Sequence, residues 1–260
     1  MHALPSTLVE TLASRYLRDA VHLDRFERTG ATGPDADGRC RTSFEVTGFS
    51  PAAADRDGFH VSACLALRML RDAIDEHAAR SGAEGPRSLR TMRARYQRPI
   101  RGTRDIQCDT WPGLRFRIAG GAFEGRAALR SAIQPPWRPD RAIATGQVLF
   151  GEERLEAGLT TDDRELDLFD AFRIAGQLCI VHGLAAANRR AKDGEVWVLV
   201  AELECAGTAV PRESHHMEID LVGRRSGLAE RGARLARYAF RDSAGHRGEL
   251  LLAFDGLEAG

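Results

Sequence analysis

The chain has 260 residues, 43% of them hydrophobic and 28% charged, so it can form one large folded domain or two smaller ones. Its 37 basic and 37 acidic residues cancel, which argues against a nucleic-acid partner. No stretch is apolar enough to span a membrane, and the first residues lack a signal-peptide pattern. We therefore expect a cytoplasmic protein without a membrane partner.

The first half of the chain begins with an amphipathic pattern at Leu8–Phe26, which predicts a short helix. A turn-rich stretch and an alternating run at Arg39–Val46 follow, and the run predicts a half-buried strand. Phe59–Ala79 predicts a second helix, apolar all round in its first half. Four strands are then expected, at Ser88–Gln97, Arg104–Trp111, Arg115–Ala119 and Arg126–Ile133.

The second half of the chain begins after the proline-rich loop Gln134–Asp140, which interrupts strand pairing and predicts a domain boundary. A strand at Arg141–Phe150 and a polar connection at Gly151–Glu165 are expected next. Leu166–Arg190 has no Asp, Glu, Lys or Arg between Arg173 and Arg189, which is typical of a helix inside a core. The remaining strands are predicted at Glu195–Cys205, His216–Val222, Ala233–Arg241 and Arg247–Phe254.

Each half therefore has the same order: a strand, a polar connection, a long apolar helix and about four strands. The ends of the halves are also alike, since FRIAGGAFEGRAALRSAI at Phe116–Ile133 and RYAFRDSAGHRGELLLAF at Arg237–Phe254 each suggest two strands around a glycine-containing turn. An antiparallel sheet needs one face covered, and the buried helix supplies that cover. We predict an α+β protein with two tandem repeats, residues 1–140, including an N-terminal extension, and residues 141–260.

This pattern resembles the hotdog fold, and the paired copies resemble a double hotdog. FHVSACLALRMLRDAI followed by MRARYQRPIRGTRDIQC, together with YAFRDSAGHRGELLLAF, is similar to the long-chain fatty acyl thioesterases of this superfamily. The resemblance implies acyl thioesters of coenzyme A or an acyl carrier protein as substrates. It also implies a site where the helix N-terminus of one copy meets the other copy.

The sequence departs from its relatives in three places. The dehydratase signature of His, Gly and Pro is missing, Ile174 stands where a Gln would follow Asp170 by four residues, and the asparagine-rich start of the thioesterase helix is absent. The resemblance therefore leaves hydrolysis and dehydration both open.

Three polar residues of the second helix form the principal candidate site. Asp170, Arg173 and Gln177 fall at i, i+3 and i+7, which places them on one stripe near the helix N-terminus. Asp170 could act as a base, with first-turn amides binding the thioester carbonyl oxygen. Arg173 and Gln177 could contact substrate or position water. Alternatively, Asp170 only stabilises the helix dipole and pairs with Arg173.

His60, at the start of the first helix, is the second catalytic candidate, because a His and an Asp with separated pKa values form an acid/base pair. It could equally be a capping residue. Arg98 belongs to a run of arginines that could meet the phosphates of coenzyme A or an acidic carrier protein, or could simply be solvated. The adjacent His215 and His216 should point to opposite faces of a strand, so we expect no metal site.

Three functions remain open from the sequence. The first is a thioesterase with Asp170 as base. The second is a 3-hydroxyacyl-thioester dehydratase, or a catalyst of conjugate addition to an enoyl thioester, in which His60 and Asp170 share proton transfer. The third is a non-catalytic acyl-binding protein. No cofactor is expected, since no glycine-rich phosphate loop is present, and the double unit could pair as a homodimer.

Overall fold

The computed structural model describes residues 6–16, 25–48, 54–55, 58–59, 61–82, 87–131, 143–161, 166–190, 196–205, 214–226 and 234–254. The chain divides into two compact units. One is Leu23–Pro139, and the other joins Met1–His22 to Asp140–Gly260.

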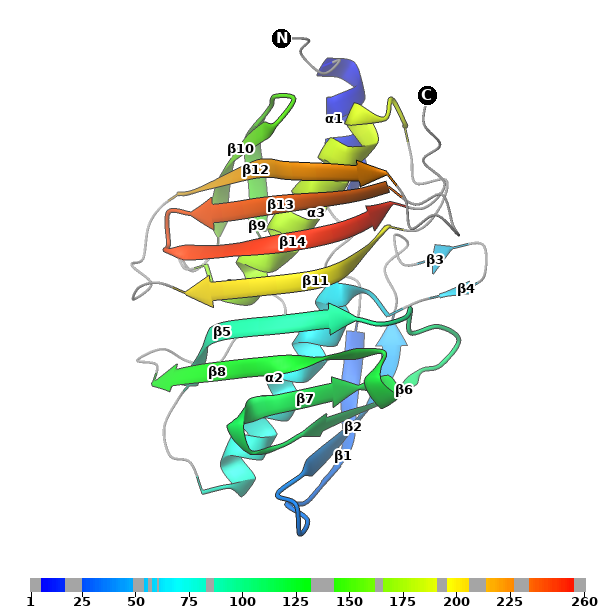
Figure 1. Cartoon of the computed structure of the whole chain (residues 1–260), viewed down its shortest axis with the longest axis vertical. Helices are drawn as coiled ribbons and strands as arrows, with labels where there is room; N and C mark the ends of the chain where they lie inside the picture. Colours follow the sequence, from blue (N-terminus) through cyan, green and yellow to red (C-terminus); the bar gives the residue numbers. More distant parts are fainter. Residues whose placement is uncertain are drawn as a thin grey trace. The chain divides into compact units, whose positions relative to one another are not determined.

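The unit Leu23–Pro139 is an antiparallel sheet with one long helix, α2 (Ala63–Arg80), against its face (Figure 1). The sheet order is β1-β2-β6-β7-β8-β5. Its strands are β1 (Arg25–Thr32), β2 (Cys40–Gly48), β5 (Arg87–Tyr96), β6 (Asp105–Thr110), β7 (Arg115–Ile118) and β8 (Phe123–Ser131). A separate two-stranded pair, β3 (Ala54–Asp55) and β4 (Gly58–Phe59), and the 3₁₀ turns η2 (Pro112–Leu114) and η3 (Ala119–Gly121) complete its described elements.

The other unit repeats this arrangement around helix α3 (Leu168–Ala186) (Figure 1). Its sheet order is β9-β10-β12-β13-β14-β11, and all neighbouring strands are antiparallel. The strands are β9 (Ile143–Phe150), β10 (Arg154–Thr161), β11 (Val196–Cys205), β12 (His215–Ser226), β13 (Arg234–Asp242) and β14 (His246–Phe254). The additional helix α1 (Ser6–Tyr16) packs on α3.

The two units share one topology. In each, two strands of the unit's main strand order precede the helix, the strand after the helix comes at one end of that unit's order, and the last three strands lie between them. The helices also correspond in detail: His77 is the fifteenth residue of α2 counted from Ala63, and His182 is the fifteenth of α3 counted from Leu168. The two units thus share a strand order and a buried histidine at the same helical position.

Helix α3 is the centre of its core because nearly every face of it is apolar. All but a few of its residues are buried, and four strands of its sheet pack against it. Contrary to the expectation from sequence, α3 is long and apolar enough to cross a membrane by length and composition, but 83% of its most apolar window is buried inside the protein. A helix with an apolar surface all round needs such cover, and here the sheet and α1 supply it.

The structure differs from the sequence-based expectations at two strands. A turn-rich segment was expected around Gly30–Gly38, and the structure has strand β1 running to Thr32 before the turn. Gly151–Glu165 was expected to be a polar connection and contains β10. Each repeat therefore has two strands before its helix, where the sequence predicted one. The side chains of β1 are mostly exposed, so its sequence carries no alternating apolar signal.

The N-terminal helix also differs from expectation in extent and in partner. We expected it over Leu8–Phe26 as an extension of the first repeat, but α1 ends at Tyr16 and contacts α3 of the second unit. Leu12 is fully buried, and Leu8 and Val9 are nearly so. The apolar stripe of α1 thus covers part of α3 that the sheet leaves open, which is a tertiary contact that its own periodicity does not specify.

Candidate functional site

Helix α3 begins with a reciprocal cap made by two aspartates. Asp167 is the N-cap, and its Oδ1 accepts a hydrogen bond of 2.8 Å from the backbone N–H of Asp170. In return, Oδ2 of Asp170 accepts from the backbone N–H of Asp167 at 3.4 Å. Such a capping box satisfies donors that the first turn of a helix leaves without partners. The local sequence therefore fixes both the start of α3 and the orientation of Asp170.

Asp170 is a buried carboxylate next to a cation. Only 4% of Asp170 is exposed, and its Oδ1 lies 3.6 Å from Nη2 of Arg173 on the next turn. Gln177, one turn further along, is half-buried. The structure thus brings Asp170 and Arg173 together as their spacing predicted. A carboxylate can accept a proton in acid–base catalysis, and here Arg173 balances its charge.

Of the other two predicted site residues, one lies outside the described residues and one belongs to the other unit. His60 lies outside the described residues, so its pairing with Asp170 stays a prediction. Arg98 belongs to the unit Leu23–Pro139 and is exposed at the bend that follows β5. The neighbouring Arg93, Arg95, Arg101 and Arg104 are also exposed.

The helix histidines form buried hydrogen bonds that the sequence did not predict. Nε2 of His182 donates to the backbone carbonyl of Glu152 at 3.0 Å, and its Nδ1 then accepts from the Tyr238 hydroxyl at 3.0 Å. His77 contacts the Thr110 hydroxyl, also at 3.0 Å. Burial lowers the pKa of both imidazoles, so they are neutral at neutral pH. Each imidazole links its helix to a strand of the same unit. The equivalent positions of the two histidines in α2 and α3 are the sequence signal that could have identified them.

A second buried polar cluster lies at the turn between β13 and β14. His246 Nδ1 is 2.8 Å from Oδ2 of Asp242, and the two side chains are almost fully buried. Cys205, at the end of β11, stands opposite His246 in the β11–β14 ladder. The Asp-x-x-x-His spacing across the turn was visible in the sequence, but the position of Cys205 beside it depends on strand register.

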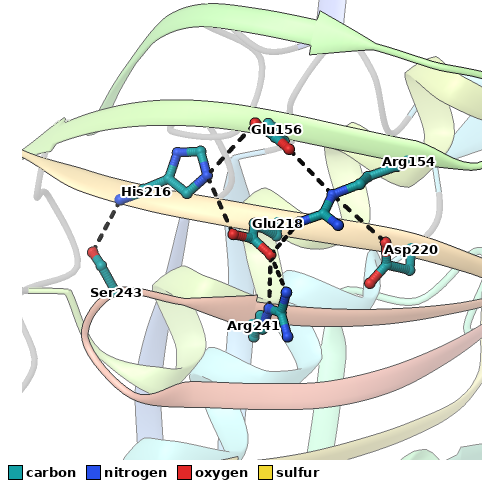
Figure 2. A network of polar contacts seen from close by, with 7 residues as sticks. All are labelled: Arg154, Glu156, His216, Glu218, Asp220, Arg241 and Ser243. Carbon is teal, nitrogen blue, oxygen red and sulfur yellow. Dashed lines mark hydrogen bonds and ion pairs between the residues drawn. The ribbon is translucent and has the colours of Figure 1, made fainter.

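Charged side chains on β10, β12 and β13 form an exposed network (Figure 2). Glu218 is at its centre and accepts hydrogen bonds from Arg154, at 2.5 Å, and from Arg241. The hydrogen bond from Arg241 is the main reason that the pKa of Glu218 lies below its usual value. His216 lies 3.7 Å from Glu218 in this network, whereas His215 is buried. The two histidines therefore point to opposite faces, as predicted.

Ion pairs between such exposed side chains contribute little to stability, so the network is a solvated sheet face rather than a reaction site. The described residues also contain no group of three or more His, Cys, Asp or Glu side chains that could hold a metal ion.

The five cysteines are all free thiols, and four of them are buried. Burial raises the pKa of Cys108 and Cys179, which keeps these two thiols protonated and unreactive. Cys64, on α2, is half-buried.

Comparison with known proteins rests on structure. No protein-family model and no curated protein sequence matches the chain. A tesB protein of Mycobacterium avium subs paratuberculosis has a TM-score of 0.52 at 14% identity, covering 95% of this chain and 98% of its own. A protein of Alicyclobacillus acidocaldarius described as having a hot dog fold has a TM-score of 0.55 at 8% identity, covering 88% and 96%.

A presumed thioesterase from Novosphingobium aromaticivorans has a TM-score of 0.51 at 12% identity, covering 88% of this chain and 99% of its own. These similarities extend over nearly the whole length of both partners in each comparison. At such low identity they report the fold and not the reaction. The resemblance drawn from the sequence is therefore confirmed at the level of architecture: this chain has the hotdog fold.

Proposed function

We propose that the chain is a double hotdog that hydrolyses acyl thioesters, with Asp170 as the general base. The observation that carries this proposal is a buried carboxylate held at the N-terminus of the central helix α3 of a hotdog unit. A presumed thioesterase has a similar fold, which supports the proposal. The strand order that the two units share supports a double hotdog.

The chemistry that Asp170 would perform follows from its surroundings. The carboxylate takes a proton from a water molecule as that water attacks the thioester carbonyl carbon, and Arg173 stabilises the carboxylate form. Amides at the N-terminus of a helix can bind the oxygen on which negative charge develops. Gln177 follows on the same stripe of the helix and positions the water or the acyl chain. The thiol leaves carrying the proton that Asp170 received.

We further propose that the substrate is carried by coenzyme A or an acyl carrier protein in the cytoplasm, with Arg98 meeting the carrier. The exposed guanidinium of Arg98 can pair with a phosphate or with an acidic carrier surface. The apolar side chains of the hotdog cores would accommodate the acyl chain.

A second candidate is a non-catalytic acyl-binding protein, and one contact favours it. The ion pair between Asp170 and Arg173, together with the burial of Asp170, is also what a purely structural carboxylate would show. Dehydration of a 3-hydroxyacyl thioester, or addition to an enoyl thioester, is the remaining reaction, and it would require His60 beside Asp170.

One experiment separates these functions. Saturated, 3-hydroxy and 2-enoyl thioesters of coenzyme A and of an acyl carrier protein are incubated with the protein, and the products are identified by mass spectrometry. Asp170→Asn is compared with Asp167→Asn. Both variants exchange a carboxylate for an amide in the same cap, and both amides can still accept the capping hydrogen bond. The pair therefore controls for helix capping and for charge.

We expect release of the free acid, slowed at least 100-fold by Asp170→Asn, since a general base contributes on the order of 10²–10⁴ in rate. Asp167→Asn should stay within a few-fold of the unaltered protein. Products that gain or lose one water and stay attached to the carrier would identify the reaction as hydration or dehydration and not hydrolysis. Substrates that bind but return unchanged would establish the acyl-binding function, and equal rates in the two variants would remove Asp170 from the mechanism.

A further inference from the structure

The turn between β13 and β14 is organised by a single carboxylate. Oδ1 of Asp242 accepts hydrogen bonds of 2.9 Å from the backbone N–H groups of Ala244 and His246. Its Oδ2 lies 2.8 Å from Nδ1 of His246. Each carboxylate oxygen is therefore engaged, and the imidazole ring is held in one orientation with Nδ1 facing Asp242. This leaves Nε2 as the ring nitrogen that can serve another group.

That other group is the thiol of Cys205. Cys205 and His246 are direct partners in the antiparallel β11–β14 ladder. Both residues are buried, with 6% and 3% exposed, so their side chains share the inner face of the sheet. Side chains directly opposite in such a ladder have Cβ atoms about 4.5–5.5 Å apart. Cys205 is therefore the residue that His246 faces across the ladder.

The electrostatics of the cluster favour an imidazolium beside the sulfur. Burial by itself would lower the pKa of His246, but the hydrogen bonds to Asp242 and Cys205 outweigh it and raise the pKa to about 9. His246 is therefore charged at neutral pH. A neighbouring imidazolium stabilises a thiolate, which is the nucleophilic form of cysteine.

We propose that Cys205, His246 and Asp242 form a thiol site that reacts with small hydroperoxides and is reversibly oxidised to a sulfenic acid. The Cys205 thiolate attacks one peroxide oxygen and the O–O bond breaks. The sulfur loses two electrons and becomes Cys–SOH, and the departing oxygen takes the proton of His246 and leaves as water or an alcohol. Asp242 orients the imidazole and is unchanged. The small exposed fraction of Cys205 suits an oxidant the size of hydrogen peroxide. This site is separate from Asp170 and does not depend on the proposed hydrolysis.

Three of the other cysteines provide internal controls for this reaction. Cys108 and Cys179 are fully buried and should remain thiols. Cys64 is more exposed than Cys205, so it would be oxidised first if exposure alone set the rate. Faster oxidation of Cys205 than of Cys64 therefore indicates activation by His246 and not access.

The test is the rate at which each cysteine of the full chain forms a dimedone adduct in dilute hydrogen peroxide at pH 7.5, read by peptide mass spectrometry. We expect Cys205 to react first and His246→Gln to slow it about tenfold, because an unperturbed thiol is roughly a tenth thiolate at this pH. Asp242→Asn should also slow Cys205, while its amide oxygen keeps an acceptor for the turn. His182→Gln removes another buried imidazole from the same unit and should leave the Cys205 rate unchanged.

Circular dichroism verifies that each variant is folded before its rate is compared. Oxidation of Cys205 no faster than that of Cys64 overturns the proposal. The proposal is also overturned if the Cys205 oxidation rate of His246→Gln lies within twofold of that of the unaltered protein. An equal slowing of Cys205 by His182→Gln overturns it too, since that would reflect general destabilisation of the unit.

Discussion

Two glycines of α3 should respond differently to the same substitution. Gly183 and Gly176 lie two turns apart on this helix. A Cβ on Gly183 would stand 2.3 Å from Cζ and 2.4 Å from Cε1 of Phe254, a residue of β14 that is 2% exposed. A Cβ on Gly176 would meet no atom within 4 Å. Gly183→Ala therefore tests the packing of α3 against its sheet, and Gly176→Ala is the matched control.

The magnitude follows from two opposing effects. Alanine is favoured over glycine in a helix interior by about 1 kcal/mol, and this gain is the same in both variants. Ordinary carbon contacts are about 3.5–4.0 Å, so the Phe254 ring or the helix must move by roughly 1 Å in Gly183→Ala. Overpacking of this kind costs about 1–3 kcal/mol. We therefore expect Gly176→Ala to raise the free energy of unfolding by about 1 kcal/mol.

Gly183→Ala should be less stable than Gly176→Ala by the overpacking cost alone, because the helix-propensity gain cancels between them. The assay is urea unfolding followed by circular dichroism, with the slope of the transition compared among the three proteins. Equal stability of the two variants, or a more stable Gly183→Ala, would refute the close approach of α3 and Phe254.

Two further changes in stability follow from the caps and the buried histidine. Asp167→Ala should lower the free energy of unfolding by about 0.5–2 kcal/mol through loss of the α3 cap. Asp167→Asn should change the free energy of unfolding by only a few tenths of a kcal/mol. A similar loss of stability in both variants would contradict the capping role. The pKa of His246 is about 9 in the folded protein and about 6.5 in the unfolded chain. Protonation of His246 therefore adds about 3 kcal/mol to the free energy of unfolding, fully below pH 6.5, and this stabilisation is lost as the pH rises through 9. Urea titrations from pH 6 to 10 should show this decline in the unaltered protein and not in His246→Gln.

Local periodicity accounts for most of the elements that the sequence predicted. The apolar run at Leu166–Arg190 predicted a core helix because a cylinder without a polar face must be covered, and α3 is such a helix. The proximity of Asp170 and Arg173 was predictable for the same reason, since residues three apart in a helix are neighbours whatever surrounds them. Strand β10 does carry a sequence signal that the prediction overlooked, because its buried residues Leu155, Ala157 and Leu159 alternate with more exposed ones, as is typical of a half-buried strand.

Tertiary structure alone decided which distant residues meet. Sequence order could suggest two repeats, but only the pairing of strands shows that both sheets follow one order and that α1 packs with the second helix. Cys205 and His246 are far apart in the chain and become partners through the register of β11 and β14. Helical neighbours are fixed by a local repeat, whereas cross-strand neighbours depend on a register that a shift of one residue would change entirely.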